Sequence, residues 1–358
     1  MQKINTVVRK IKSSQRISKE DALFLYNNAT LSDLCILANE IKNEKHGKKV
    51  YFIQNVHVEP TNYCVYKCKF CSFQKQPYEK NFFDFSWDEI KNFLEKLPKT
   101  IKEIHITGGV HPERDIYWYI KLIQNIQKVQ PQAKIKAFTA IEINYMCNKA
   151  KISIEEGLKL LKEKGLVALA GGGAEILNDE IRKKLCPEKG NSLLWINTHI
   201  KAHQLGIKSN ATMLYGHLES IEHRVEHMNT IRNIQDKTNS FQAFIPLKFR
   251  NKNNYLSNVS EVPYIEDIKI FALARIFFDN ISHIKAYWPM LGREKSLFLL
   301  HTGVDDIDGT IFNSTKIYSM SGSDEQSPSI SVEELKNLII KENFIPVERD
   351  ILYNEIKS

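Results

Sequence analysis

The segment 51–71, YFIQNVHVEPTNYCVYKCKFC, decides the fold and the chemistry of this chain. Its first nine residues form an extended apolar run of the kind that makes a buried strand. The loop that follows carries Cys64, Cys68 and Cys71 in the spacing C-x3-C-x2-C. Three thiolates this close on one loop can bind three corners of an iron–sulfur cube. No fourth cysteine is near in the sequence, so one iron would stay open to a substrate or cofactor, as the open position of a catalytic zinc does.

A zinc site is the main alternative for these three thiols. Structural zinc usually takes four ligands, often as two C-x2-C pairs. The second pair is missing here, and His57 lies on the preceding strand and not on the loop. The spacing therefore favours an open [4Fe-4S] cluster.

The rest of the chain alternates short apolar runs with amphipathic segments. Eight strands alternating with helices indicate parallel βα units, and eight units suggest closure into a barrel. The fold class expected is α/β, a (β/α)8 TIM-type barrel with N-terminal helices and a C-terminal cap. The expected strands are 51–59, 101–107, 134–140, 166–170, 207–214, 241–247, 283–288 and 303–308. The expected helices are 19–27, 33–44, 87–97, 116–129, 154–164, 193–205, 221–238, 265–278, 293–300 and 332–342.

This order of elements divides the chain into three parts. Residues 1–46 are expected to be a helical extension in which Ser18 and Ser32 cap two helices, 47–309 the barrel, and 310–358 a cap whose residues 346–353 are extended.

Composition limits the classes of function. The apolar fraction of 42 % is enough for a full globular core, and the net charge is +8 from 50 basic and 42 acidic residues. Lysines are spread along helices beside glutamates, as in 159–164, which indicates a solvated surface and not a nucleic-acid patch. The N-terminus is polar and no apolar run approaches the length of a membrane span. We expect a cytoplasmic protein with no nucleic-acid or membrane partner and an anionic small-molecule substrate.

In such barrels the chemistry lies where strands end and the next loops begin. This rule brings the cysteine loop together with four other strand ends. They are Gly108 and Gly109, then Glu142, then the glycines 171–173 with Glu175, and then 215–219. Glycines let a backbone approach a ligand closely, and a free backbone N–H can face an anion. Glu142 is read as a carboxylate that ends the third strand.

Other candidates are weaker. Cys35, Cys147 and Cys186 share no ligand spacing with one another or with the loop, and are expected to be buried or incidental thiols. His199 and His203 stand at helical spacing, but no acidic residue accompanies them in the HExxH manner, so an ordinary helix face is expected.

These motifs resemble the radical S-adenosylmethionine superfamily, whose signature C-x3-C-x-aromatic-C matches Cys64, Cys68, Phe70 and Cys71. The resemblance implies that S-adenosylmethionine chelates the open iron through its amine and carboxylate and is cleaved to methionine and a 5′-deoxyadenosyl radical. It also implies an electron donor such as a flavodoxin or ferredoxin. By position, the cofactor-binding residues implied are Phe70, Gly108, Gly109, Glu142, Thr212, Leu214, Gly216 and Glu219.

Several blocks are similar to the aminodeoxyfutalosine synthases within that superfamily. They are 171–176, Cys186-Pro-Glu-Lys189, 209–217, 241–247 and 283–288. The resemblance implies that the adenosyl radical adds to 3-[(1-carboxyvinyl)oxy]benzoate on the route to menaquinone, so S-adenosylmethionine is consumed as a co-substrate. Candidates for binding the two carboxylates are the 171–173 backbone, Arg250 and His217, and Glu175 is a further catalytic candidate.

Two alternatives remain open. The related dehypoxanthine futalosine cyclase shares part of these motifs. A zinc-dependent nucleic-acid-binding module is a remote alternative that rests on the charge and the three cysteines.

Overall fold

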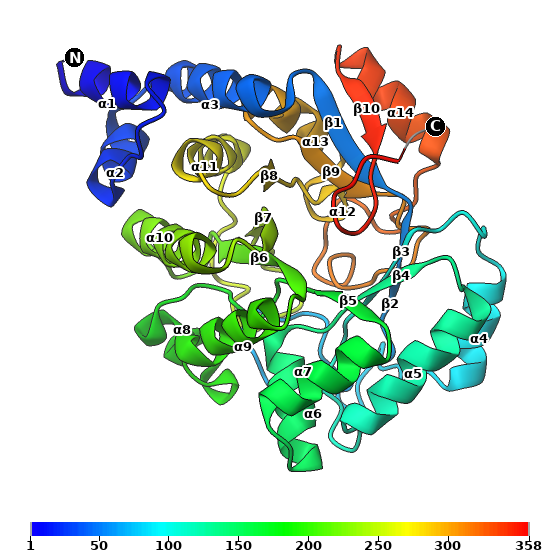
Figure 1. Cartoon of the computed structure of the whole chain (residues 1–358). Helices are drawn as coiled ribbons and strands as arrows, with labels where there is room; N and C mark the ends of the chain where they lie inside the picture. Colours follow the sequence, from blue (N-terminus) through cyan, green and yellow to red (C-terminus); the bar gives the residue numbers. More distant parts are fainter. Residues whose placement is uncertain (1, 357–358) are drawn as a thin grey trace.

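The computed structural model describes residues 2–356. Their backbone forms a ring of parallel strands inside a shell of helices (Figure 1). The strands are β1 (Lys49–Ile53), β2 (Asn55–Val58), β3 (Glu103–Ile106), β4 (Lys134–Ala137), β5 (Leu166–Leu169), β6 (Lys208–Tyr215), β7 (Phe241–Lys248), β8 (His283–Ile284), β9 (Asp306–Gly309) and β10 (Ile345–Glu348).

The helices lie between the strands in the sequence, and most cover the outside of the ring. They are α1 (Gln2–Lys12), α2 (Lys19–Asn28), α3 (Leu31–His46), α4 (Trp87–Glu95), α5 (Ile116–Val129), α6 (Ala140–Ala150), α7 (Ile154–Glu163), α8 (Asp179–Leu185), α9 (Ser192–Gln204), α10 (Ile221–Thr238), α11 (Tyr264–Phe277), α12 (Trp288–Leu291), α13 (Arg293–Leu299) and α14 (Val332–Lys341). Short 3-10 turns η1 (Pro187–Lys189) and η2 (Leu300–Thr302) follow α8 and α13.

The expected TIM-type α/β fold is confirmed, but the strand expected over 283–288 ends at Ile284, and the first and third strands also differ from the prediction. Strands β2 to β8 form one parallel sheet in chain order, and β1 pairs with β9 and β10 in a second sheet. The single strand expected over 51–59 is two strands, because the carbonyl of Gln54 accepts from Lys102 and Glu103 beside β3 while that of Ile53 accepts from Thr310 beside β9. A parallel bridge from Lys285 to Asp306 joins β8 to β9, so the strands connect around the ring.

The third expected strand ends earlier than predicted. Strand β4 stops at Ala137, Phe138 takes a positive φ of 62°, and Thr139 is the N-cap of α6. Glu142, read from the sequence as the end of this strand, therefore lies in the first turn of α6. Ala140 and Ile141 are buried in this helix, as they would also be in a strand. Their apolar character therefore could not distinguish a helix from a strand at this point of the chain.

The two ends of the chain pack against the barrel. In α3, Leu34, Leu37 and Ala38 are buried, and its N-cap is Thr30 and not the expected Ser32, whereas Ser18 caps α2 as expected. At the other end β10 pairs with β1, and α14 precedes it. Helices α6, α8 and α12 were not anticipated as such.

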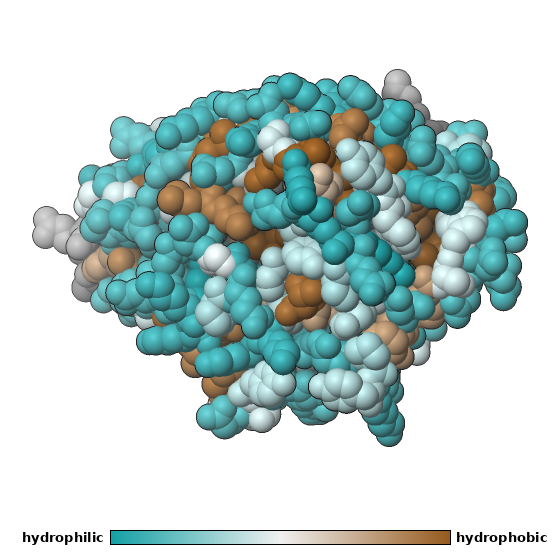
Figure 2. All heavy atoms as spheres, turned by 90° about the horizontal axis from the view of Figure 1, so that it is seen from below, coloured by the Kyte–Doolittle hydropathy of each residue, from teal (hydrophilic) through white to brown (hydrophobic). Residues whose placement is uncertain are grey.

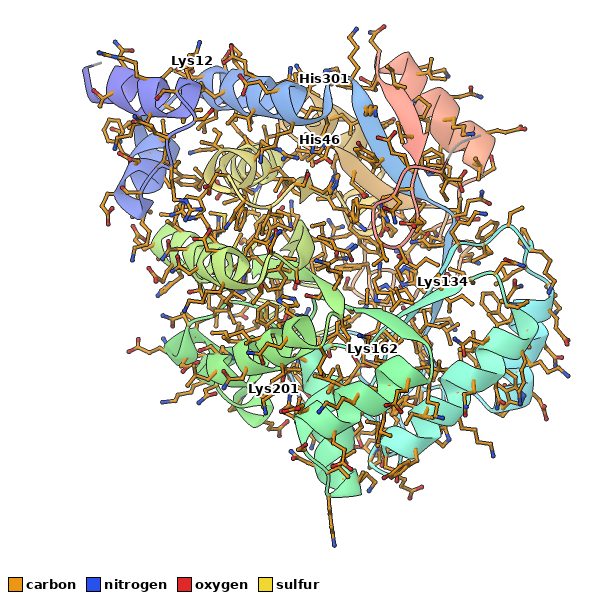
Figure 3. The ribbon with its side chains drawn as sticks, viewed as in Figure 1. Lys12, His46, Lys134, Lys162, Lys201 and His301 are labelled. Atoms are coloured by element: carbon orange, nitrogen blue, oxygen red, sulfur yellow. The ribbon has the colours of Figure 1, made fainter. Side chains whose placement is uncertain are left out.

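The face in Figure 2 is mostly hydrophilic, with apolar side chains in scattered groups. The lysines labelled in Figure 3 come from α1, β4, α7 and α9. Within residues 2–356 no helix has both the length and the apolar character needed to cross a bilayer.

The capping of α6 generates a first prediction. The buried Glu142 carboxylate accepts hydrogen bonds from Thr139 N at 2.7 Å, Thr107 Oγ1 at 3.1 Å and Gly108 N at 3.2 Å. Glu142→Gln replaces one accepting oxygen with an NH2 group, and should lower the free energy of unfolding by about 1.5–3 kcal/mol in denaturant titrations.

Glu89 is the matched control, because it occupies the same capping-box position in α4 but is exposed. Glu89→Gln should cost less than about 1 kcal/mol. Equal losses in the two variants would show that burial of the Glu142 carboxylate adds nothing.

Candidate active site

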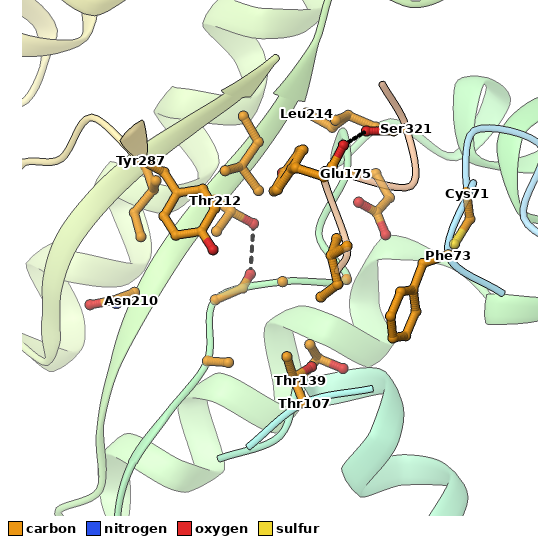
Figure 4. Close-up of a pocket in the computed structure, with 18 of the residues that line it drawn as sticks. Cys71, Phe73, Thr107, Thr139, Glu175, Asn210, Thr212, Leu214, Tyr287 and Ser321 are labelled. Carbon is orange, nitrogen blue, oxygen red and sulfur yellow. Dashed lines mark hydrogen bonds between the residues drawn. The ribbon is translucent and has the colours of Figure 1, made fainter. Parts of the chain in front are cut away.

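A cavity of about 290 Å³ opens at the carboxyl ends of the strands and reaches into the ring. Its wall includes Phe70, Cys71 and Phe73 from the cysteine loop, and Tyr318 and Ser321 from the segment before α14. In Figure 4, Cys71 and Phe73 lie on one side of this cavity and Asn210 and Tyr287 on the other. The cavity therefore joins the cysteine loop to the interior of the barrel.

The cysteine loop lies between β2 and α4 and is held by backbone hydrogen bonds to neighbouring loops. Val65 N donates to Val110 O at 2.9 Å, and Lys69 N donates to Leu185 O at 2.8 Å. The carboxylate of Glu188 accepts from Lys67 N at 2.7 Å. These contacts fix the loop from two sides before any metal is bound.

The three thiols fit an iron–sulfur cluster. Cys64 and Cys68 are buried and Cys71 partly so. Burial raises the pKa of Cys64 to about 12, and burial followed by the nearby Cys68 raises the pKa of Cys71. Three adjacent thiolates are thus unfavourable with protein groups alone, and cationic irons would supply the charge that stabilises them.

Gly108 and Gly109 serve the cysteine loop directly. A Cβ on Gly109 would lie 2.3 Å from Tyr63 O, and one on Gly108 would lie 2.8 Å from Thr61 O. Gly109 N also donates to Thr61 O at 2.8 Å. The close approach that glycine permits here is between two backbones. Gly108 also lines the cavity, whereas Gly109 does not.

Cys186 and Lys189, whose contacts could not be predicted from the sequence, lie in the turn after α8. The Cys186 thiol lies beside Cys68 and raises the pKa of that thiol, although their spacing in the sequence gave no sign of it. Lys189 pairs with Glu175 at 2.8 Å, and its Nζ lies 5.2 Å from the centre of the Phe70 ring. Burial would lower the pKa of Lys189, but Cys68 and Glu175 raise it well above its ordinary value. Glu175, with a positive φ of 48°, and Lys189 both line the cavity.

The 171–173 glycines form the wall between β5 and α8. A Cβ on Gly171 would lie 2.6 Å from Asn210 O, so this glycine allows β6 to approach. Thr212 Oγ1 donates to Gly171 O at 2.8 Å (Figure 4), and Leu214 N donates to Glu175 O at 2.8 Å. Thr212 and Leu214 therefore both support and line the cavity, as their expected position requires.

Like Gly109 and Glu142, three further expected residues in the turn after β6 lie outside the cavity lining. Glu219 accepts from Gly216 N at 2.6 Å and from Arg224 Nε at 2.7 Å. Despite burial, contacts with His217 and Arg224 lower the pKa of Glu219 to about 2. His217 lies 2.8 Å from that carboxylate, and its Nε2 contacts Leu214 O. In the structure Gly216, His217 and Glu219 shape the turn after β6.

Arg250 lines the cavity and holds the segment that covers it. Its guanidinium donates to Gly322 O at 3.0 Å and lies 3.4 Å from the carboxylates of Glu261 and Asp324. Sequence reasoning did not find the covering residues Tyr318 and Ser321, because contacts between loops distant in the chain leave no local pattern.

The chain matches two known sequence families. Residues 58–231 match the Radical SAM superfamily, and 238–357 match the CofH/MqnC C-terminal region. Aminodeoxyfutalosine synthase of Thermus thermophilus is 38 % identical over 98 % of this chain and 95 % of that protein. The chain belongs to the radical SAM superfamily. It is an enzyme of that superfamily, which implies a [4Fe-4S] cluster and S-adenosylmethionine.

Other relatives carry the same name or a different one. Aminodeoxyfutalosine synthase of Streptomyces coelicolor is 33 % identical over 98 % of this chain and 93 % of that protein. The 5-amino-6-(D-ribitylamino)uracil–L-tyrosine 4-hydroxyphenyl transferase of Methanocaldococcus jannaschii is 36 % identical over 95 % of this chain and 97 % of that protein.

Solved structures support the fold. Methylornithine synthase (PylB) superposes with a TM-score of 0.76 at 17 % identity, covering 95 % of this chain and 97 % of the other. The FeFe-hydrogenase maturase HydG from Carboxydothermus hydrogenoformans gives 0.74 at 17 % identity, covering 98 % and 81 %.

The cysteine loop generates a second prediction. Replacing Cys64, Cys68 or Cys71 by Ala removes one of three thiolate ligands, so iron content and the absorbance near roughly 400 nm typical of such clusters should be lost after anaerobic reconstitution.

Cys35→Ala and Cys147→Ala are the matched controls, because both thiols lie away from the loop, and both variants should keep full iron content. Iron retained in a loop variant, or lost in a control, would show that the ligands are assigned wrongly.

Proposed function

We propose that this enzyme is an aminodeoxyfutalosine synthase of menaquinone biosynthesis. The bond between the adenosyl C5′ and sulfur breaks with uptake of one electron, and C5′ bonds to the CH2 carbon of the enolpyruvyl double bond of 3-[(1-carboxyvinyl)oxy]benzoate. In the adduct the aryl C–O bond breaks as a C–C bond to the ring forms. One carboxyl group leaves as bicarbonate, with water as the source of its third oxygen, and the electron taken up in the first step is released again. The products are 6-amino-6-deoxyfutalosine and methionine.

The observation that carries this proposal is the continuous cavity that runs from Phe70 and Cys71 into the barrel. It can hold an aromatic acid beside the place where the cofactor would bind. The names of the Thermus and Streptomyces relatives, which match this chain nearly end to end, support the same reaction.

The residues of the chain would have three tasks. Cys64, Cys68 and Cys71 would hold the cluster, which when bound supplies the electron that cleaves S-adenosylmethionine; a flavodoxin or ferredoxin would provide that electron. Phe70, Gly108, Thr212 and Leu214 would contact the adenosyl part.

The third task is to position the substrate and to close the cavity over it. Holding two reactants in near-attack geometry accelerates the reaction between them, and excluding water protects a reactive radical from side reactions. Tyr318 and Ser321, in the segment held by Arg250, would close the cavity over the reactants.

Carbon labelling tests this proposal. With S-adenosylmethionine carrying carbon-13 in the ribose, the enolpyruvyl benzoate and a chemical reductant, anaerobic enzyme should give labelled aminodeoxyfutalosine and unlabelled methionine in equal amounts by mass spectrometry. Addition requires the adenosyl skeleton to end in the product.

The two alternative activities, a dehypoxanthine futalosine cyclase and a 4-hydroxyphenyl transferase, would give different products. Parallel incubations contain dehypoxanthine futalosine, or L-tyrosine with 5-amino-6-(D-ribitylamino)uracil. Labelled 5′-deoxyadenosine formed one-for-one with a product would contradict addition, and the productive substrate would then identify the cyclase or the 4-hydroxyphenyl transferase.

A further inference from the structure

The inner face of the barrel is polar at a level where such barrels are usually filled by branched aliphatic side chains. His57 on β2, His105 on β3 and Lys136 on β4 are direct register partners on three neighbouring strands. Lys285 follows β8 and Asp308 lies on β9, and all five residues line the cavity. The deep end of the cavity is thus built from side chains that are costly to bury.

The two lysines have partners within the protein. Lys136 Nζ lies 2.5 Å from Glu103 Oε1, and Lys285 Nζ lies 3.3 Å from Asp308 Oδ1. Both ammonium groups are almost fully buried, and each is balanced by one of these carboxylates. Each lysine therefore forms a neutral pair with a carboxylate, and its remaining N–H groups are the donors that it can offer to a ligand.

The two imidazoles, in contrast, have unused hydrogen-bonding capacity. Neither ring nitrogen of His57, which is 4 % exposed, has a hydrogen-bond partner among the described residues, and neither does Nε2 of His105. The centres of the two rings are 4.7 Å apart. Leaving a buried polar group unpaired typically costs about 1–3 kcal/mol. Two such groups side by side in a cavity wall therefore point to a ligand.

The protonation of these rings defines what they can offer. Burial lowers the pKa of His57 to about 4, and burial followed by His57 lowers the pKa of His105 well below its ordinary value. Both rings are neutral near pH 7, so each carries one N–H donor. Two neutral N–H donors side by side match the two oxygens of a carboxylate.

We propose that His57 and His105, flanked by Lys136 and Lys285, bind the carboxylate of an aryl acid at the deep end of the cavity. The inference rests on the proposed function and extends it: the benzoate carboxylate lies against the imidazoles. The enolpyruvyl group then faces Cys71, because that residue lies on the side of the cavity opposite Tyr287, whose ring centre is 6.1 Å from that of His57.

Binding without turnover tests this inference. Reconstituted holoenzyme is titrated by calorimetry with 3-[(1-carboxyvinyl)oxy]benzoate and with the analogue whose ring carboxylate is a primary amide, without S-adenosylmethionine or reductant. The amide lacks the charge that the site would recognise. The wild type should bind it about 10- to 100-fold more weakly than the acid, the range expected for charge-assisted hydrogen bonds.

Variants of His57 and His105 test whether these two residues recognise the carboxylate. His57→Phe and His105→Phe should weaken binding of the acid about tenfold or more and leave the amide nearly unchanged, so that discrimination between the two falls. His105→Gln keeps an N–H donor and should restore part of the affinity. Cluster absorbance and melting temperature establish that each variant is folded, and this conservative variant keeps the test decisive if a phenylalanine is not tolerated.

The control variants change an exposed lysine on the same strand as Lys136 and an exposed histidine away from the cavity. Lys134 is exposed two residues before Lys136 on β4, and His301 is an exposed imidazole on η2. Lys134→Met and His301→Phe should bind both probes as the wild type does. Unchanged acid affinity in the folded His57 and His105 variants would overturn this inference and leave the proposed function standing. No binding of the acid by the wild type would overturn both.

Discussion

The site depends on one backbone contact, the packing of the cysteine loop against Gly108 and Gly109. A cluster needs three thiolates in one place, and burial alone opposes their ionisation, as the raised pKa of Cys64 shows. The loop must therefore be held by other groups. With a Cβ at position 109 only 2.3 Å from Tyr63 O, any larger residue would push the loop from β3. The glycine pair is thus a condition for the position of the cysteine loop and not simply a turn.

The barrel interior shows a second constraint, between stability and binding. Lys136 and Lys285 could have been aliphatic residues that pack the barrel as in other folds of this type. Each is instead paired with a carboxylate, which limits the cost of burial without removing it. Polar side chains that gain little for folding are expected where a ligand supplies the missing partners.

Sequence reasoning located what short-range patterns encode. The spacing of Cys64, Cys68 and Cys71 and the alternation of strands with helices were sufficient for the barrel and its family. The division of the first strand into β1 and β2 at Gln54 could not be predicted from the sequence. The chain changes its hydrogen-bonding partners there, but the residues before and after Gln54 remain extended and largely apolar. Glu142 was placed in a strand because Ala140 and Ile141 are buried in either element. The contacts of Cys186 and Lys189 depend on tertiary structure. His57, His105 and Lys136 are polar residues within apolar strands, a pattern that was present in the sequence but was not interpreted as a ligand site.

Residues 315–322, which include Tyr318 and Ser321, cover the cavity and control the access of water to it. Tyr318 and Ser321 can exclude water only if their segment is held at both ends. At one end the buried Glu59, directly before the cysteine loop, accepts from Thr315 Oγ1 at 2.5 Å and Lys316 N at 2.9 Å. At the other end Arg250 donates to Gly322 O. Because Glu59 belongs to the chain segment that leads into the cysteine loop, the residues that place the thiols also anchor the segment that covers them, so cluster site and closure are built on the same part of the barrel.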